Sequence, residues 1–555
     1  MADPDTWSLP EEIVPKVGLA KTEQDGFDDS APAPSLTELD PSLLRGVTLS
    51  ASLSSWGKHF ASQASSSMYE VQERDWNLSF LVQNLHHFLS HDWKTSRSAK
   101  TLSLMFIFNT QGAFLATLPF CILIGFWREP APAVVSYTKS KGDLEDLLAY
   151  PIFLFFFCFW QRFRNLVKRP VVVFLDKLCI AQHNSEQKAK GILGLATFLD
   201  KSTNLTILWS PRYFSRLWCC YEIATFLREA DTAHGEAKPG AKSMKSTTLF
   251  PVAFSWIAVL WAVTWTVPVV WIYATFAISD LSKDSCLQCS AVGGLLLAGF
   301  DFVLEAVLVY AGLDLFSSVD GLDRQLRDFN IKEADCFCCG CNHQHPETGE
   351  TLMCDRIFVY QAVKQWYVRY EDDDDDDALE KFNQAVRTRL RSKVLESVSK
   401  TSGVLLPQTM VIYLPCFACL PWISDSVALM REGRLWMPGG FGPLHSLWRC
   451  IAIFSTLYTV PVLVTMSCFW IFWMLVRLAV KCTKCTKCRG SKLCLSMVLG
   501  ATLTFLFGSI NLLYIDLLVR MEAEDLVDFV PFINFPLLLL NFYLYKANSC
   551  TCRRH

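Results

Sequence analysis

Seven cysteine and histidine side chains crowd together near the middle of the chain, within residues 334–356 (ADCFCCGCNHQHPETGETLMCDR). Zinc prefers four thiolate or imidazole ligands in a tetrahedron, and such ligands commonly come from two turns. The irregular spacing matches no standard zinc finger, so reduced or lipidated thiols are the alternative to a structural zinc ion. The side chains that could supply a Cys₃His set are Cys338 or Cys339, with Cys341, His345 and Cys354.

Two carboxyl groups interrupt an apolar stretch at residues 291–313. Asp301 and Glu305 are four residues apart, so a helix places them one turn apart on the same face. Carboxyl groups inside a membrane are costly and usually functional, which here suggests a proton or cation path. The alternative is a helix buried in protein, with these groups protonated or paired.

A second group of cysteines lies beside lysines and arginines at the ends of apolar stretches. Juxtamembrane cysteines among basic residues are typical palmitoylation sites, and we expect that modification here. Metal binding by the C-x-x-C-x-x-C pattern and unmodified thiols are the alternatives. The cysteines concerned are Cys482, Cys485, Cys488, Cys494, Cys550 and Cys552.

An acidic run, EDDDDDDALEKF, covers residues 371–382. Negative charge is favourable at a helix N-terminus, so we interpret the run as the solvated start of a helix. Weak calcium binding is the alternative.

The composition indicates what must position these groups. Of the 555 residues, 51% are hydrophobic and 19% are charged, whereas soluble domains usually carry about 25% charged residues. The 40 phenylalanines and 18 tryptophans suit apolar cores and membrane interfaces. The net charge of −3 gives no global field that would favour nucleic acid. We therefore expect a multi-pass α-helical membrane protein rather than an ordinary soluble enzyme or a nucleic-acid-binding protein.

About 20 apolar residues are needed to cross the hydrocarbon core of a bilayer, and eight stretches are candidates. The second is short, and prolines interrupt the fifth at Pro407, Pro415 and Pro421. The eight predicted spans are 108–127, 147–163, 254–278, 291–313, 404–424, 450–478, 494–519 and 527–545.

Basic residues set the expected orientation. The segments at 164–169, 481–492 and 546–555 are basic and adjoin predicted spans, so the positive-inside rule places them in the cytoplasm. Eight crossings then place both termini there as well. Residues 1–107, 164–253 and 314–403 would share this compartment.

The pattern between the second and third spans differs from the rest of the chain. β-Branched and apolar runs predict buried strands, and segments with apolar residues at helical spacing predict helices. Their alternation is typical of a parallel α/β domain. The expected strands are 170–182, 204–211 and 247–254, and the expected helices are 186–202 and 213–229.

The phrases FLDKLCI (174–180), KGILGLATFLDKS (190–202) and LTILWSPRYFSRLWCCYEI (205–223) resemble the middle of a Toll/interleukin-1 receptor (TIR) domain. Upstream, HHFLSHDW (86–93) resembles the end of the family's first strand through Phe88, Ser90 and His91. The residues that match downstream are Phe174, Asp176, Gly191, Ile192, Ser202, Ser210, Tyr213, Ser215, Trp218, Cys219 and Glu222.

The resemblance implies a flavodoxin-like parallel sheet that is split by a membrane hairpin. The chain would begin with a mostly disordered arm (1–75, with one helix near 68–84), followed by the first strand and helix of the TIR-like module (85–108). A transmembrane hairpin (108–163), the remainder of the module (166–254) and a transmembrane pair (254–313) would come next. The rest would be a cytosolic Cys/His-rich segment with the acidic run and a helix (314–403), four spans (404–545) and a basic, Cys-containing tail (546–555).

TIR-family members that cleave NAD use one glutamate in the W-C-x-x-E helix, and the resemblance places that role on Glu222. NAD would then be a substrate bound at the carboxyl edge of the sheet. The alternatives are an adaptor that only self-associates, a surface ion pair of Glu222 with Arg212 or Arg216, and core packing for Trp209. Ser90 and Asp92 could instead cap the helix that begins near Lys94. The residues expected at the substrate are Ser90, Asp92, Asp176, Trp209, Ser210 and Cys219.

Three functional hypotheses follow. The first is a membrane-anchored signalling or sensing protein that self-associates in the cytosol through the TIR-like module and cleaves NAD. The second is an ion or solute channel or transporter, with Asp301 and Glu305 in its pathway and the α/β module as a regulator. The third is a non-catalytic membrane scaffold. All three have the lipid bilayer as a partner.

Overall fold

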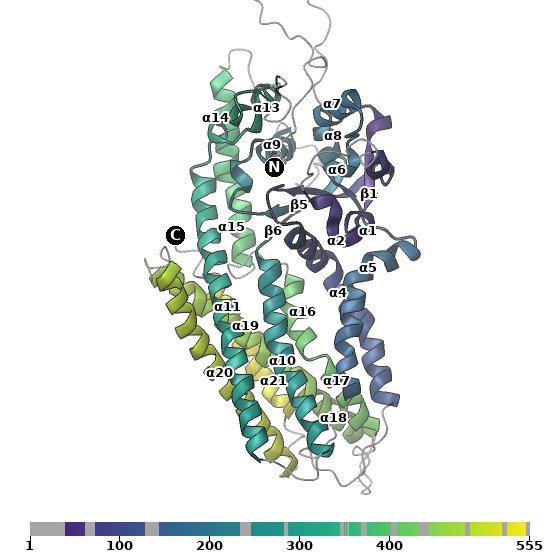
Figure 1. The fold of residues 1–555 in the computed structure, drawn as a ribbon, viewed down its shortest axis with the longest axis vertical. Helices are drawn as coiled ribbons and strands as arrows, with labels where there is room; N and C mark the ends of the chain where they lie inside the picture. The colour runs from purple at the N-terminus through teal and green to yellow at the C-terminus, as the bar shows by residue number, and fades with distance from the viewer. Residues whose placement is uncertain are drawn as a thin grey trace, which may run out of the picture. The chain divides into compact units, whose positions relative to one another are not determined.

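The computed structural model of the chain divides into two units, each assembled from three separate segments (Figure 1). Unit 1 comprises Met1–Ser103, Gln161–Val252 and Gly321–Leu395, and unit 2 comprises Leu104–Trp160, Ala253–Asp320 and Glu396–His555. The structure describes residues 39–61, 73–127, 144–232, 246–281, 287–344, 349, 351, 354–367, 375–400, 408–431, 443–482, 489–523 and 530–550.

Unit 1 contains a six-stranded mixed sheet in the order β2-β1-β4-β3-β5-β6. Strands β4, β3, β5 and β6 run parallel to one another, whereas β1 pairs antiparallel with both β4 and β2. The strands are β1 (Arg45–Thr48), β2 (Phe80–Leu81), β3 (Leu85–His91), β4 (Val172–Phe174), β5 (Ser202–Trp209) and β6 (Ser246–Pro251). The parallel pattern predicted between the second and third spans is confirmed, and β6 leads directly toward the next long helix as expected.

Strand β3 lies in the middle of this sheet although its neighbours follow it much later in the chain. His87 is in register with Val173 of β4 on one side and with Asn204 of β5 on the other. The backbone N–H of Val172 also donates to His86 Nδ1 over 3.0 Å. Residues 85–93 and 170–176 therefore belong to one sheet.

The apolar residues of β3 and β4 are buried because helices cover the parallel part of the sheet. Phe88 stacks on Phe174 with ring centroids 4.6 Å apart, and Phe174 contacts Phe198 at 4.5 Å. The predicted helix at 186–202 is divided at Gly194, where an added Cβ would lie 2.4 Å from Leu39 Cδ1. The helices beside the sheet are α6 (Asp176–Cys179), α7 (Ser185–Leu193), α8 (Leu195–Asp200) and α9 (Leu217–Thr232).

The last segment of unit 1 is helical. The acidic run predicted to begin a helix does so, since α14 begins at Asp375. The elements are the end of α11 (Leu287–Arg327), α12 (Phe337–Gly340), α13 (Asp355–Tyr367), α14 (Asp375–Ala385), a π-helical turn (Val386–Leu390) and α15 (Arg391–Lys400).

Only residues 39–61 and 73–75 of the arm predicted to be mostly disordered (1–75) are among the described residues. Residues 39–61 are ordered, with β1 followed by α1 (Leu49–Ser52) and α2 (Ser54–Gly57). Val47 and Leu49 are fully buried, so this short piece adds apolar surface to the core. The helix expected to reach residue 84 is also wrong at Phe80–Leu81, which form β2.

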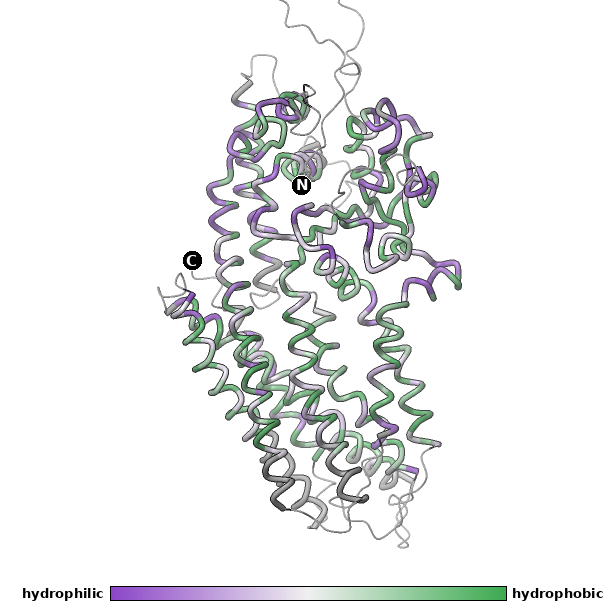
Figure 2. Tube along the Cα trace, viewed as in Figure 1, coloured by the Kyte–Doolittle hydropathy of each residue, from purple (hydrophilic) through white to green (hydrophobic). Residues whose placement is uncertain are grey.

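Six helices among the described residues are long and apolar enough to cross a membrane, as a multi-pass membrane protein requires. Figure 2 shows hydrophobic residues along most of the length of these helices. The candidate spans are Arg97–Trp127 (α4), Glu145–Leu166 (which includes α5, Ala149–Leu166), Phe254–Trp271 (in α10, Phe254–Leu281), Gly293–Arg327 (in α11), Cys450–Lys481 (which includes α19, Val460–Cys482) and Arg489–Ile510 (in α20, Arg489–Ala523).

Two of the eight predicted spans are not among these six. The stretch 404–424 does not form one helix, because the chain breaks between α16 (Gln408–Ala418) and α17 (Pro421–Arg431). Pro421 lacks the backbone N–H that a continuous helix would need there. Residues 527–545 correspond to α21 (Val530–Cys550), which is helical but is not one of the six.

Polar bonds and close backbone approach hold helices together inside unit 2. Asn109 Nδ2 donates to the Phe157 carbonyl over 2.8 Å, and Tyr150 OH donates to the Ala418 carbonyl over 2.7 Å. An added Cβ on Gly500 would lie 2.8 Å from Ala306 Cα, so α20 and α11 touch there. Small residues commonly permit such contacts between membrane helices.

Candidate functional site

The carboxyl ends of β3, β4 and β5 meet at one edge of the sheet, and polar residues follow each of them. Ser90, His91 and Asp92 stand at the end of β3, Asp176 follows β4, and Ser210 follows β5. Ligands of open α/β sheets bind at this edge. The edge thus gathers four of the six residues expected at a substrate, Ser90, Asp92, Asp176 and Ser210, although Asp92 and Asp176 come from segments about 80 residues apart.

Glu222 reaches this edge from α9. The Ser90 hydroxyl donates to Glu222 Oε2, and the Tyr213 hydroxyl lies 2.5 Å from Ser90 Oγ. Since a serine hydroxyl has one proton to donate, Tyr213 is the donor to Ser90 in this chain of bonds. The Glu222 side chain is partly exposed, whereas Ser90 and Tyr213 are fully buried.

Burial raises the pKa of Glu222 to about 8. The hydrogen bond from Ser90 opposes this shift, the charge of Asp176 adds to it, and the charge of Arg216 opposes it. The carboxyl is therefore largely protonated at neutral pH, and nearby positive charge would ionise it.

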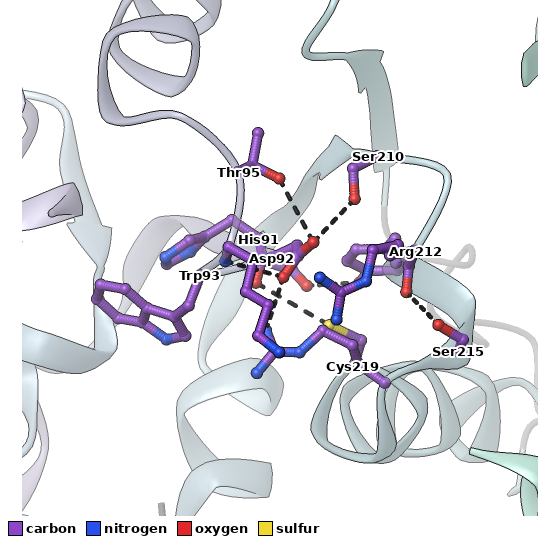
Figure 3. Close-up of polar contacts among 12 residues, drawn as sticks. His91, Asp92, Trp93, Thr95, Ser210, Arg212, Ser215 and Cys219 are labelled. Carbon is purple, nitrogen blue, oxygen red and sulfur yellow. Dashed lines mark hydrogen bonds and ion pairs between the residues drawn. The ribbon is translucent and has the colours of Figure 1, made fainter. Parts of the chain in front are cut away.

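Asp92 contacts four groups at the same edge, and Figure 3 labels two of the residues concerned, Thr95 and Ser210. Ser210 Oγ donates to Asp92 Oδ2 over 3.2 Å, and the Lys94 N–H donates to Asp92 Oδ1 over 3.1 Å. Arg216 Nη1 lies 3.4 Å from Asp92 Oδ1, and the two side chains are 8% and 2% exposed. Asp92 thus closes the turn after β3 and forms a buried ion pair, but it does not cap a helix near Lys94, because α4 begins only at Arg97. Ser90 has no part in that turn.

Asp176 and Lys100 add opposite charges beside this pair. The Trp93 indole N–H donates to Asp176 Oδ2 over 3.1 Å, and the Lys177 N–H donates to Oδ1 over 2.7 Å. Burial raises the pKa of Asp176 to about 6 despite these bonds. Lys100 is fully buried, and its Nζ donates to the carbonyl oxygens of Asp92 and Trp93 over 3.2 and 3.4 Å.

His91 and Cys219 are more deeply placed than Glu222. His91 is 6% exposed, and its Nε2 has no hydrogen-bond partner among the described residues. Burial, with Lys100 and Arg216 nearby, holds the pKa of His91 well below its usual range. Cys219 Sγ approaches the His91 carbonyl at 4.0 Å, and burial raises its pKa. Burial therefore favours the uncharged imidazole of His91 and the uncharged thiol of Cys219.

Trp209 lies in the core at the end of β5. Its side chain is 1% exposed, and its indole Nε1 is buried without a hydrogen-bond partner among the described residues. This environment favours the core-packing alternative over stacking on a ligand. Trp218, by contrast, is partly exposed and donates to Asp355 Oδ2 over 3.2 Å.

The Cys/His stretch brings together a set that only partly matches the predicted one. Cys338, Cys339, His343 and Cys354 have ligand atoms within 4.8 Å of one another. Cys341 is outside this group, and its thiol contacts the Cys338 carbonyl at 3.4 Å. The predicted ligand His345 lies outside the described residues.

The carboxyl pair of α11 lies in unit 2. Glu305 is 2% exposed and Asp301 is partly exposed. Glu305 Oε2 and Asp301 Oδ1 are both buried without a hydrogen-bond partner among the described residues. The structure therefore places both groups on one helix in an apolar environment.

Sequence reasoning missed Lys100 and His343. Lys100 lies in the first turn of the first long apolar helix, where a lysine is normally found at the interface of membrane and water. Its sequence spacing gives no sign that its side chain is buried. His343 was visible within the Cys/His stretch, but the turn that brings it to Cys338, Cys339 and Cys354 depends on backbone conformation. Arg216 was considered only as a partner of Glu222.

Comparisons of the chain with protein-family models, curated proteins and solved structures find no match. The functional argument therefore depends on the geometry described above.

Proposed function

We propose that the chain is a membrane-anchored signalling protein whose unit 1 is a TIR-like module that self-associates in the cytosol and cleaves NAD at Glu222. The parallel strands cross the sheet in the order β4-β3-β5-β6. In chain order this is second, first, third and fourth, which is the order of flavodoxin-like sheets. The distribution of basic residues supports a cytosolic position for unit 1 and both termini.

The observation that carries the proposal is the contact between Ser90 and Glu222. These residues are 132 positions apart and lie on the two sides of the predicted hairpin. Their meeting at the carboxyl edge of the sheet agrees with the place that the TIR resemblance gives to both.

The surroundings of Glu222 suit cleavage of the nicotinamide–ribose bond. As nicotinamide leaves, positive charge develops on the ribose, and a nearby carboxylate stabilises it. The pKa of Glu222, raised to about 8, would fall when the cationic nicotinamide ring approaches. Ser90 and Tyr213 orient the carboxyl, so its position needs no reorganisation during the reaction.

The test is nicotinamide release from NAD by the full chain purified in detergent. Wild type should turn over, and Glu222→Gln should lower the rate by about 100-fold or more, the effect of losing one preorganised group in a transition state. Glu186→Gln is the matched control, because Glu186 is exposed and forms its ion pair with Lys190 of the same helix. Equal rates for wild type and Glu222→Gln would contradict the catalytic part of the proposal.

Self-association is tested separately by cross-linking the chain in native membranes. Oligomers that persist in Glu222→Gln, without turnover by wild type, would favour a non-catalytic adaptor. Monomers without turnover would leave the membrane scaffold as the better hypothesis.

A second candidate function is transport through unit 2. It is favoured by Glu305, a carboxyl that is 2% exposed and has an oxygen without a described hydrogen-bond partner. Such groups inside membrane helices commonly mark ion or proton paths. Proton or cation flux into proteoliposomes that disappears in Glu305→Gln and Asp301→Asn would support this function, and the absence of flux in wild type would oppose it.

A further inference from the structure

Four metal-ligating side chains converge in unit 1, outside the site at the sheet edge. Cys338 and Cys339 lie on the single turn of α12, His343 follows that turn, and Cys354 immediately precedes α13. The sulfur and nitrogen atoms they offer lie within 4.8 Å of one another. Cys338 is fully buried and the other three are partly exposed.

The spacing of these atoms fits a tetrahedral zinc ion. Zinc–thiolate bonds of about 2.3 Å place two sulfur atoms about 3.8 Å apart at the corners of a tetrahedron. Cys339 Sγ and Cys354 Sγ are 3.7 Å apart. This separation is much longer than a disulfide bond, and all the cysteines of the group are free thiols.

The backbone bends sharply to include His343. Asn342 and His343 are two consecutive residues with left-handed φ angles of 54° and 58°. The His343 N–H donates to the Cys338 carbonyl over 2.7 Å, which folds the chain back over α12. Asparagine and histidine tolerate this conformation better than most residues. An antiparallel bridge between Gln344 and Thr351 then returns the chain toward Cys354.

The same segment is fastened to the start of α9. The Asp355 N–H donates to Cys338 Sγ over 3.3 Å, and the Asp355 carboxylate accepts the Trp218 indole N–H over 3.2 Å. Beside it, the Leu217 N–H donates to the Asp335 carbonyl over 3.1 Å. Leu217 is the first residue of α9, the helix that carries Glu222.

We propose that Cys338, Cys339, His343 and Cys354 bind one structural zinc ion, which clamps the Cys/His segment onto the start of α9. Four protein ligands fill a tetrahedron and leave no open position, so this zinc is structural and not catalytic. The N–H···S bond from Asp355 orients one ligand and joins the metal site to Trp218. The proposal is independent of NAD cleavage, because it requires no substrate.

Metal analysis of the full chain, purified without chelators, tests the ligand set. We expect about one zinc per chain in wild type, loss of that zinc in Cys339→Ser and Cys354→Ser, and full retention in the matched control Cys341→Ser. A wild-type chain without zinc overturns the proposal. So does loss of zinc in Cys341→Ser together with retention in Cys339→Ser, since the ligands would then be a different set.

Cobalt(II) keeps the test valid where a serine variant fails to fold. Wild type reloaded with cobalt(II) should give the strong visible absorption of a tetrahedral site and a thiolate charge-transfer band. His343→Cys should keep the metal and shift this spectrum toward that of four sulfur ligands. An octahedral spectrum in wild type, or an unshifted one in His343→Cys, overturns the assignment.

Hydrogen exchange tests the clamp. Removal of zinc from wild type should increase amide exchange in residues 213–222, beginning with Leu217, at least several-fold. The peptide covering 45–52 in β1 and α1 serves as an internal reference, because it contains no residue of the proposed metal site or of its contacts with α9. Unchanged exchange at Leu217 after zinc is removed would show that the metal does not hold this contact.

Discussion

Glu222 and Glu305 are both glutamates on helices, but their surroundings differ in kind. Glu222 accepts a hydrogen bond from Ser90, and it lies near enough to Arg216, which pairs with Asp92, for the charge of Arg216 to lower its pKa. Glu305 lies one turn from Asp301 on an apolar helix, and its Oε2 has no described donor. The first carboxyl is supported by groups from distant parts of the chain, whereas the second depends on its own helix.

This difference separates preorganised sites from isolated polar groups. A network built from several strands and helices can hold charge at a fixed position, because each donor is itself held by another contact. A lone carboxyl in an apolar setting has no such support and must find a proton, a cation or a partner. The predictions below test whether this contrast is real, from the largest expected effect to the smallest.

The largest effect is expected at Asp92. Asp92→Ala removes a carboxylate that is 2% exposed, with its ion pair to Arg216 and its hydrogen bonds from Ser210 and the Lys94 N–H, so stability should fall by about 3–5 kcal/mol. The loss of stability is measured by thermal unfolding of the full chain in detergent, with susceptibility to proteolysis as the readout of unfolding. The control is Glu186→Ala, which breaks an exposed pair with Lys190 and should leave stability almost unchanged. Similar losses for both variants would contradict a stabilising network at the sheet edge.

Ser90→Ala should have the next largest effect. It removes the hydrogen bond that lowers the pKa of Glu222, so that pKa should rise above about 8. Because the ionised carboxyl is the active form in the proposed reaction, activity should rise with pH through the Glu222 pKa. In Ser90→Ala the rising limb should therefore move to higher pH, with a rate about 10-fold lower at pH 7. The control is Ser215→Ala, whose hydroxyl donates to the Arg212 carbonyl. If the rising part of the pH–rate profile stays at the same pH in Ser90→Ala, then Ser90 does not lower the pKa of Glu222.

The stability of unit 1 should depend on the protonation of Glu222. Its folded pKa, raised to about 8, exceeds the ordinary value of 4.5. The folded state therefore binds more protons, and this contribution is fully present below about pH 4.5 and is lost as pH rises through about 8. In Glu222→Gln, the free energy of unfolding should fall less steeply between pH 6 and 8 than it does in wild type. Below pH 6 the free energy of unfolding should still fall with rising pH, because the pKa of Asp176 is also raised, to about 6. Unfolding midpoints measured across this range check the prediction.

The smallest effect is expected at Glu305. An amide has nearly the same shape as the carboxyl, and no described residue bonds Glu305 Oε2, so Glu305→Gln should change stability by less than about 1 kcal/mol. The same thermal measurement applies. A loss comparable to that of Asp92→Ala would mean that Glu305 has a charged partner and that the contrast with Glu222 is smaller than described.

The strands were predictable from sequence where they are apolar and long enough to show a pattern. β5 and β6 are recognisable in this way, and the TIR resemblance brings Ser90 and Glu222 to the same edge. β1 could not be predicted, because Arg45–Thr48 is only four residues long and contains no run of apolar residues. Its assignment as a strand depends on pairing with β4, which no local pattern records.

The residues of the candidate sites were less predictable than the strands. Asp92, Asp176 and Ser210 follow strand ends and were expected from the fold. Burial of Lys100 arises from tertiary packing, and selection of His343 arises from two left-handed residues in succession. Both depend on three-dimensional context that residue type and spacing do not encode.

The central place of β3 has a consequence for biosynthesis. The ribosome synthesises β3 before residues 108–163. It synthesises β4 and β5, which pair with the two edges of β3, only afterwards. Until β4 and β5 have been made, β3 has two open edges and cannot complete the sheet. A chain that is arrested between β3 and β4 should therefore leave the edges of β3 open to chaperones and proteases.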